Sequence, residues 1–340
     1  MRLSKQSLAF AVAVAVLLFT LWRLVEPGEA QKIPPEFVLY VKEPKATTAG
    51  TPPLGNWDTP TGVVAVDGDL FVLDTGNDRI LKLDKTGRVT AILCEVGDCG
   101  RLLKAPQAIT AHEGLLYVAN TGAGQVVVLS TDGSLISTIE PRVSATAGKE
   151  RFAPSGIVVS TEGDIYVADT GKDLVLRLSN GGETASVFMS DKGESDKYRV
   201  SKPIGLSIDV WGNIYIANSG NGRIRKYSPE GRHLQEFAMR SNPSFFSPAY
   251  VAVDIRGNVY FTDNRSRMIY VYGQAGDLAG VVGLLDAKRV DSPGVLRDPW
   301  GLYLDGNTLY VADKTMGLFG FQVELDYWKK AESSGFWGHP

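Results

Sequence analysis

Carboxylates and amides recur along this chain at a spacing that could gather them for acid–base chemistry. Each of six aromatic residues is followed, three positions later, by an aspartate or asparagine: Asp74, Asn120, Asp169, Asn218, Asp263 and Asp313. A carboxylate can move protons, but it can equally accept the N–H groups of a tight turn. Because six equivalent positions share this residue type, we expect a structural role. Arg79 and Arg223 are predicted to pair with these side chains.

A second set of polar residues stands six positions after a repeated proline, at Asp209, Asp254, Asp305 and His112. At the same offset the first and third copies have Val66 and Ser160. An aspartate directly after a strand is usually a turn residue. The chain has no Gly-x-Ser-x-Gly nucleophile motif and no nucleotide-binding loop.

Both sets belong to a phrase that occurs six times along the chain. The copies begin at prolines 45 to 51 residues apart, namely Pro60, Pro106, Pro154, Pro203, Pro248 and Pro299. A period of this length suits four short strands. Six four-stranded sheets arranged radially can bury their faces against one another. The sequence therefore predicts an all-β, six-bladed β-propeller at 60–325, followed by a tail at 326–340.

The repeated phrase resembles the NHL repeat. The resemblance rests on Pro-x-Gly-hydrophobic followed by Gly-x-(Ile/Leu)-Tyr-Val-Ala-Asp-Thr-Gly-Asn-x-Arg-Ile, which is nearly complete at 74–80 and 218–224. It covers roughly residues 57–325 and is weaker at 263–266 and 313–316. It implies an NHL-like propeller, and such domains generally serve as binding scaffolds. Function nevertheless belongs to a site and not to a fold.

Other six-bladed propellers that this chain resembles are enzymes. Lactonase and strictosidine-synthase-like propellers hold a calcium ion or an active site in the central channel. That resemblance implies Asp209, Asp254 and Asp305 as candidate ligands for Ca²⁺ or Zn²⁺. A peptidyl-amide lyase with similar repeats uses three histidines for zinc. The three histidines here occupy non-equivalent positions, so we expect no shared zinc site: His112, His233 and His339.

Residues 1–30 are a predicted targeting segment. Arg2 and Lys5 precede an apolar run that reaches residue 22 and continues past Arg23 to residue 25. This length suits a signal peptide, and it just suffices for a signal-anchor helix that crosses the membrane. The propeller is therefore expected outside the cytoplasm, either membrane-anchored or, after cleavage, secreted or periplasmic.

The linker at 31–59 contains one apolar segment of high β-propensity, residues 37–41. The sixth copy offers only three strand-like segments, whereas each of the others offers four. We predict that 37–41 supplies the missing outer strand of blade six and closes the ring.

The two cysteines, Cys94 and Cys99, are separated by four residues that include a Gly-Asp turn. In an exported protein this spacing predicts a local disulfide.

The connections between blades are where binding is expected, because loops carry most functional residues. They hold an excess of basic side chains and one apolar cluster. The predicted binding residues are Arg142, Arg151, Lys197, Arg199, Phe245, Phe246, Lys288 and Arg289.

These observations predict a non-catalytic, extracytoplasmic binding propeller that recognises a protein, peptide or glycan through its loop face and needs no cofactor. The alternative is a hydrolase or lactonase with a metal ion in the central channel. With 35 basic and 38 acidic residues the chain has a net charge of -3, so nucleic-acid binding is not expected.

Overall fold

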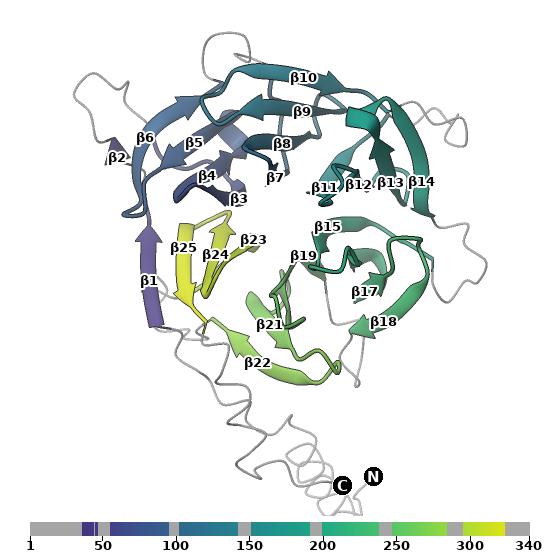
Figure 1. Cartoon of the computed structure of the whole chain (residues 1–340). Coiled ribbons are helices and arrows are strands. Elements are labelled where there is room, and N and C mark those ends of the chain that lie inside the picture. Colours follow the sequence, from purple (N-terminus) through teal and green to yellow (C-terminus); the bar gives the residue numbers. More distant parts are fainter. Residues whose placement is uncertain are drawn as a thin grey trace, which may run out of the picture.

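The computed structural model describes residues 36–43, 45–46, 55–94, 102–141, 151–190, 199–237, 247–283 and 295–323. They form six sheets arranged radially about one axis (Figure 1). The predicted all-β, six-bladed propeller is thus confirmed. The targeting segment at 1–30 and the tail at 326–340 lie outside the described residues, and the domain boundaries stay predictions. Within the described ranges, no helix has the length and hydropathy to cross a membrane.

Each blade is an antiparallel sheet in which the first strand lies nearest the axis. Blade one has β3 (Pro60–Val66), β4 (Asp69–Asp74), β5 (Arg79–Leu83) and β6 (Arg88–Leu93); blade two has β7 (Ala108–His112), β8 (Leu115–Asn120), β9 (Gln125–Ser130) and β10 (Leu135–Ile139); blade three has β11 (Pro154–Val159), β12 (Ile165–Asp169), β13 (Leu174–Ser179) and β14 (Thr184–Ser190). Blade four has β15 (Pro203–Ile208), β16 (Ile214–Asn218), β17 (Arg223–Tyr227) and β18 (His233–Phe237); blade five has β19 (Pro248–Val253), β20 (Val259–Asp263), β21 (Met268–Tyr272) and β22 (Leu278–Val282); blade six has β23 (Pro299–Asp305), β24 (Thr308–Asp313) and β25 (Gly317–Gln322). Within the described ranges, three 3-10 turns follow strands: η1 (Thr75–Asn77), η3 (Asn180–Gly182) and η5 (Ser219–Asn221).

The meander gives the ring two different faces. One face carries the hairpins between second and third strands and the connections between blades, and we call it the loop face. The opposite face carries the turns between first and second strands, at 209–213 in blade four and 254–258 in blade five, and the hairpins between third and fourth strands, at 228–232 and 273–277 in the same blades. We call it the turn face. First strands of neighbouring blades contact one another all the way round, so the ring is closed.

The N-terminal strand β1 (Glu36–Val41) closes the ring on its outer side. It pairs antiparallel with β25, with Val41 opposite Leu318, and Figure 1 shows the two strands side by side. Tyr40 stacks on Phe319 with ring centroids 4.8 Å apart. The predicted ring-closing strand is therefore confirmed. A short strand that the sequence did not predict, β2 (Lys45–Ala46), then pairs in parallel with β6 of blade one.

The recurring aspartates and asparagines fasten each blade to the segment that leads into it. Asp74 Oδ1 accepts the N–H of Asp58 at 2.8 Å, and Asn120 and Asn218 accept equivalent N–H groups at 2.7 Å. The six side chains are buried, which confirms their predicted structural role. Arg79 pairs with Asp74 at 2.9 Å as predicted. The prediction for Arg223 is wrong: residue 218 is an uncharged asparagine, and Arg223 pairs with Glu236.

Asp169 is the one member of this set whose second oxygen is buried and has no hydrogen-bond partner among the described residues. Burial raises the pKa of Asp169, although the N–H of Ala153 and the charge of Lys172 oppose the shift. In blades two and four the equivalent asparagines donate from Nδ2 to a loop carbonyl, that of Leu102 or Arg199.

We expect Asp169→Asn to stabilise the protein by about 1 kcal/mol at neutral pH, since it removes an unsatisfied acceptor. The folded-state pKa lies above the unfolded value, so the wild type loses stability as the pH rises between the two values. The gain in the variant should therefore be present at neutral pH and shrink below about pH 4. Urea unfolding at several pH values measures it. A variant that is less stable than the wild type at neutral pH would contradict this account.

Candidate functional site

Comparison of the six blades with one another shows where the repeat is broken. In the first four blades, the recurring buried Asp or Asn is followed by a threonine or serine. The hydroxyl of that residue donates to the carbonyl of the proline that starts the next blade. Thr75 bonds Pro106 O at 2.7 Å, and Thr121, Thr170 and Ser219 make the equivalent bonds. Blades five and six carry Asn264 and Lys314 at this position instead. The regular inter-blade hydrogen bond is therefore lost on one side of the ring.

A second break lies two residues after the starting proline. Four blades have glycine there, because neighbouring first strands approach closely: a Cβ on Gly156 would lie 2.2 Å from Ile204 O, and one on Gly301 would lie 2.3 Å from Thr61 O. Blade two has Ala108 and blade five has Tyr250. The close approach of first strands favours glycine at this position, so it does not account for the large side chain of Tyr250.

The Tyr250 side chain crosses the centre of the ring. Its hydroxyl donates to the carbonyl of Gln107 at 2.6 Å and lies 3.2 Å from the carbonyl of Ser155. These carbonyls belong to blades two and three, on the far side of the axis from blade five. Burial raises the pKa of the Tyr250 phenol, so the hydroxyl keeps its proton at physiological pH. Tyr250 therefore ties three blades together at the hub.

Trp300 and Lys314 of blade six stand beside Tyr250. The Trp300 and Tyr250 ring centroids are 5.9 Å apart, and Lys314 Nζ lies 3.1 Å from the Trp300 ring centroid. In blades one and three the two equivalent positions hold a pair of hydroxyl groups, such as Thr61 and Thr75 at 2.6 Å. Blade six thus has an amine over an indole where blades one and three have a structural hydrogen bond.

The electrostatic setting of Lys314 is unusual for a lysine. Burial lowers the pKa of its amine, and the carboxylate of Asp298 opposes that shift. The indole N–H of Trp300 is buried and interacts with the Tyr250 hydroxyl, and this interaction opposes the effect of burial on the pKa of the phenol. Both side chains are only partly exposed. A half-buried amine with a lowered pKa is a candidate for proton transfer.

We call Tyr250, Trp300 and Lys314 the hub site. All three lie near the loop-face end of the axis, because Tyr250 and Trp300 are at the start of first strands and Lys314 follows β24. None of these three residues was among the predicted site residues. The signal that could have found the site is the departure of these positions from the other repeats, namely tyrosine for glycine and lysine for threonine or serine.

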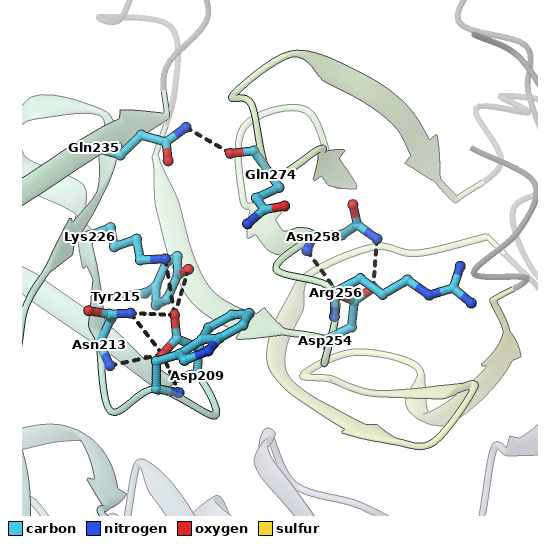
Figure 2. Close-up of polar contacts among 10 residues, drawn as sticks. Asp209, Asn213, Tyr215, Lys226, Gln235, Asp254, Arg256, Asn258 and Gln274 are labelled. Carbon is cyan, nitrogen blue, oxygen red and sulfur yellow. Dashed lines mark hydrogen bonds and ion pairs between the residues drawn. The ribbon is translucent and has the colours of Figure 1, made fainter. Parts of the chain in front are cut away.

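The residues predicted for a channel metal lie on the other face, in turns. Asp209 accepts the N–H groups of Trp211 at 3.0 Å and Asn213 at 2.9 Å, and it pairs with Lys226 at 3.0 Å (Figure 2). Burial alone would raise the pKa of Asp209, but the hydrogen bonds from Asn213 and Lys226 bring it below the ordinary value. Asp209 is thus a fully engaged turn residue.

Asp254 repeats this arrangement in blade five. It accepts the N–H groups of Arg256 and Asn258, both at 2.9 Å, and the side chain of Asn258 at 2.8 Å (Figure 2). Asp305 is exposed at the end of β23. Among the described residues, no three His, Cys, Asp or Glu side chains come together as a group able to hold a metal. Asp209, Asp254 and Asp305 therefore do not fit the metal ion of the alternative prediction.

The two described histidines lie in different blades. His112 ends β7 in blade two, and His233 begins β18 in blade four, where its ring lies 5.6 Å from that of Tyr227. His339 lies outside the described residues. Cys94 is buried at the end of blade one, but Cys99 also lies outside the described residues, so the disulfide between them stays a prediction.

Only two of the predicted binding residues can be placed. Arg151 is exposed and donates to the carbonyl of Ala123 between blades two and three. Arg199 is exposed, and its carbonyl accepts from Asn218 and Arg225. Both lie on the loop face. The other predicted residues lie outside the described part of the chain: Arg142, Lys197, Phe245, Phe246, Lys288 and Arg289.

A comparison with protein-family models found none that matches this chain, and a search of curated protein sequences also found no match. The resemblance to NHL repeats is therefore not confirmed.

Solved structures do match. A catalytically inactive variant of virginiamycin B lyase from Staphylococcus aureus, determined with quinupristin, has a TM-score of 0.58 and 15% identity over 80% of this chain and 97% of that one. A gluconolactonase from Xanthomonas campestris has a TM-score of 0.58 and 16% identity over 86% and 99% of the two chains. A protein of unknown function from Bacteroides thetaiotaomicron has a TM-score of 0.62 and 13% identity over 85% and 75%. At such identities the likeness establishes the fold: this chain is a six-bladed β-propeller of the kind found in gluconolactonases and virginiamycin B lyase.

Proposed function

We propose that this protein is a hydrolase or lyase that acts on an ester or lactone bond at the hub site. The observation that carries the proposal is Lys314, whose amine lies 3.1 Å from the Trp300 ring centroid and whose pKa is lowered by burial. The enzyme names of two similar structures favour catalysis over the predicted non-catalytic scaffold. The hub site also lies in blades five and six, the two blades that lack the threonine or serine after the recurring Asp or Asn.

The chemistry assigned to the hub site is general base catalysis. In its neutral form the Lys314 amine would accept a proton from water, whose oxygen then attacks the carbonyl carbon of the substrate. The C–O bond then breaks, and the proton returns from Lys314 to the leaving oxygen. In a lyase the same amine would take a proton from carbon while a C–O bond breaks.

Tyr250 serves in this proposal as a positioning residue. Its hydroxyl is engaged by the carbonyl of Gln107, so it is not the acid or the base. Its ring supports Trp300 from the centre of the ring of blades. We further propose that the blades are divergent NHL repeats, and that the targeting segment at 1–30 exports the propeller, so that the substrate is extracytoplasmic.

The test is turnover by the purified full chain of two probes taken from the similar structures, D-glucono-1,5-lactone and quinupristin. Lactone hydrolysis is followed by acid release and quinupristin cleavage by mass spectrometry. Turnover of either probe by the wild type, and its loss in a Lys314 variant, is the expected result. Turnover that is unaffected by loss of the Lys314 amine would overturn the assignment.

A further inference from the structure

The turn face carries an exposed apolar patch that the hub site does not use. Of the large hydrophobic side chains that are exposed in the described residues, three lie at the tips of two neighbouring turns: Val210 and Trp211 in blade four and Ile255 in blade five. Their exposed fractions are 64%, 58% and 71%. Single exposed hydrophobic residues are ordinary, but a group of them on adjacent projections marks an interaction surface.

The two tips are held rigidly. In each turn the aspartate accepts the N–H groups two and four residues ahead, and an asparagine side chain reinforces it (Figure 2). Gly212 and Gly257 complete the turns at φ of 79° and 83°. The two blades are also tied to one another by Gln235 Nε2, which donates to the carbonyl of Gln274 at 3.1 Å (Figure 2). The apolar side chains therefore project from a fixed platform.

The other four turns between first and second strands have a different character. Each carries an exposed carboxylate: Asp67, Glu113, Glu162 and Asp305. The position of Val210 and Ile255 is occupied in blade three by Thr161. The apolar tips are thus confined to the sector of blades four and five.

The course of the chain indicates what lies opposite the turn face. β25 starts at the loop face and ends at the turn face, where Val323 N–H donates to Asn307 O at 2.7 Å. β1 is antiparallel to β25, with Glu36 opposite Gln322, so the chain enters β1 from the turn face. The apolar segment at 8–25 is joined to β1 by residues 26–35 alone. Ten extended residues span at most about 35 Å, which would keep the turn face close to any bilayer that holds that segment.

We propose that the turn face docks on a lipid bilayer, with Val210, Trp211 and Ile255 inserted at the interface. Tryptophan favours the headgroup region, and aliphatic side chains favour the acyl boundary below it. Exposed carboxylates disfavour insertion at the inner turns of the other four blades, and Glu230 and Asp277 do so at the outer hairpins of blades four and five. The ring therefore tilts toward the inner turns of blades four and five. This orientation leaves the loop face, with the hub site, directed away from the membrane.

The test uses an environment-sensitive fluorophore attached to cysteine in the full chain, as Ile255→Cys and, for a matched control on the same face, Thr161→Cys. Labelling of the wild type gives the background from Cys94 and Cys99. The purified proteins are mixed with phosphatidylcholine vesicles that contain doxyl-labelled lipid. We expect a blue shift at position 255 and quenching about threefold stronger than at 161, because the inserted depth is only about 5–10 Å.

Equal and weak quenching at both positions would overturn the proposal. So would a blue shift at 255 without lipid quenching, since that result indicates contact with a second copy of this chain on this face. Activity toward the two probes is expected to be unchanged in both variants, because neither position belongs to the hub site. Weak quenching with normal turnover of a probe would therefore refute membrane docking alone. Strong quenching at 255 with no role for Lys314 in turnover would refute the proposed function alone.

Discussion

Replacing Lys314 with methionine is expected to lower kcat/KM for the hydrolysed probe by about 100-fold or more, the ordinary contribution of a general base. Methionine preserves the length and apolar body of the side chain over the Trp300 ring, but it cannot accept a proton. The rate of the wild type should rise with pH and level off above the Lys314 pKa, which burial holds below the ordinary lysine value. The variant should lack this rise.

The matched control is Lys202→Met. Lys202 is an exposed lysine on the same face, directly before Pro203, and it does not contact the hub site. We expect it to retain wild-type activity and pH dependence. Lys314→Met should melt within a few degrees of the wild type, because Lys314 makes no inter-blade hydrogen bond of the kind made by Thr75. If both variants kept full activity, Lys314 would have no role in the reaction.

Deleting residues 31–45 is expected to cause the largest loss of stability. The deletion removes β1, with the buried side chain of Val41 and the ring of Tyr40 that stacks on Phe319. Loss of two or three such side chains costs roughly 5 kcal/mol. In a domain of this size that corresponds to a fall in Tm of about 10 °C or more. The unpaired edge of β25 should also promote aggregation.

Thermal unfolding followed by circular dichroism measures this effect. Val38→Thr is the control, since Val38 lies in the same strand with 48% of its surface exposed, and its Tm should match that of the wild type. A deletion variant that melts with the wild type would show that β1 contributes nothing to ring closure.

The fold could be predicted from the sequence because its determinants are periodic. Every blade has a starting proline, an aromatic residue in its second strand and a buried aspartate or asparagine at equivalent positions. The ring-closing strand could be predicted as well, because blade six lacked one strand and 37–41 had the character of that strand. The parallel pairing of β2 with β6 was missed, since two residues, Lys45 and Ala46, carry no strand signal.

The hub site could not be predicted in the same way, because it depends on contacts between residues far apart in the sequence. The Tyr250 hydroxyl bonds the Gln107 carbonyl across 143 residues, and no local pattern indicates that reach. Asp209 and Asp254 were given a second interpretation, as metal ligands, because their offset in the repeat is regular. Regularity indicates structure here, and departure from it is the signal for the hub site: Tyr250 stands where four blades have glycine, and Lys314 stands where four blades have threonine or serine.

The most direct test of the hub site is competitive acetylation of the lysines of the native protein across a series of pH values, quantified by mass spectrometry. The account predicts that Lys314 reacts with a midpoint below 10.5, the ordinary lysine pKa. It also predicts that an inert lactam analogue of gluconolactone protects Lys314 and leaves Lys202 reactive. Two results would contradict the claim that this amine is the base at the centre of the propeller. One is a Lys314 midpoint at or above the ordinary lysine pKa, and the other is failure of the lactam analogue to protect Lys314 in protein that turns over the lactone.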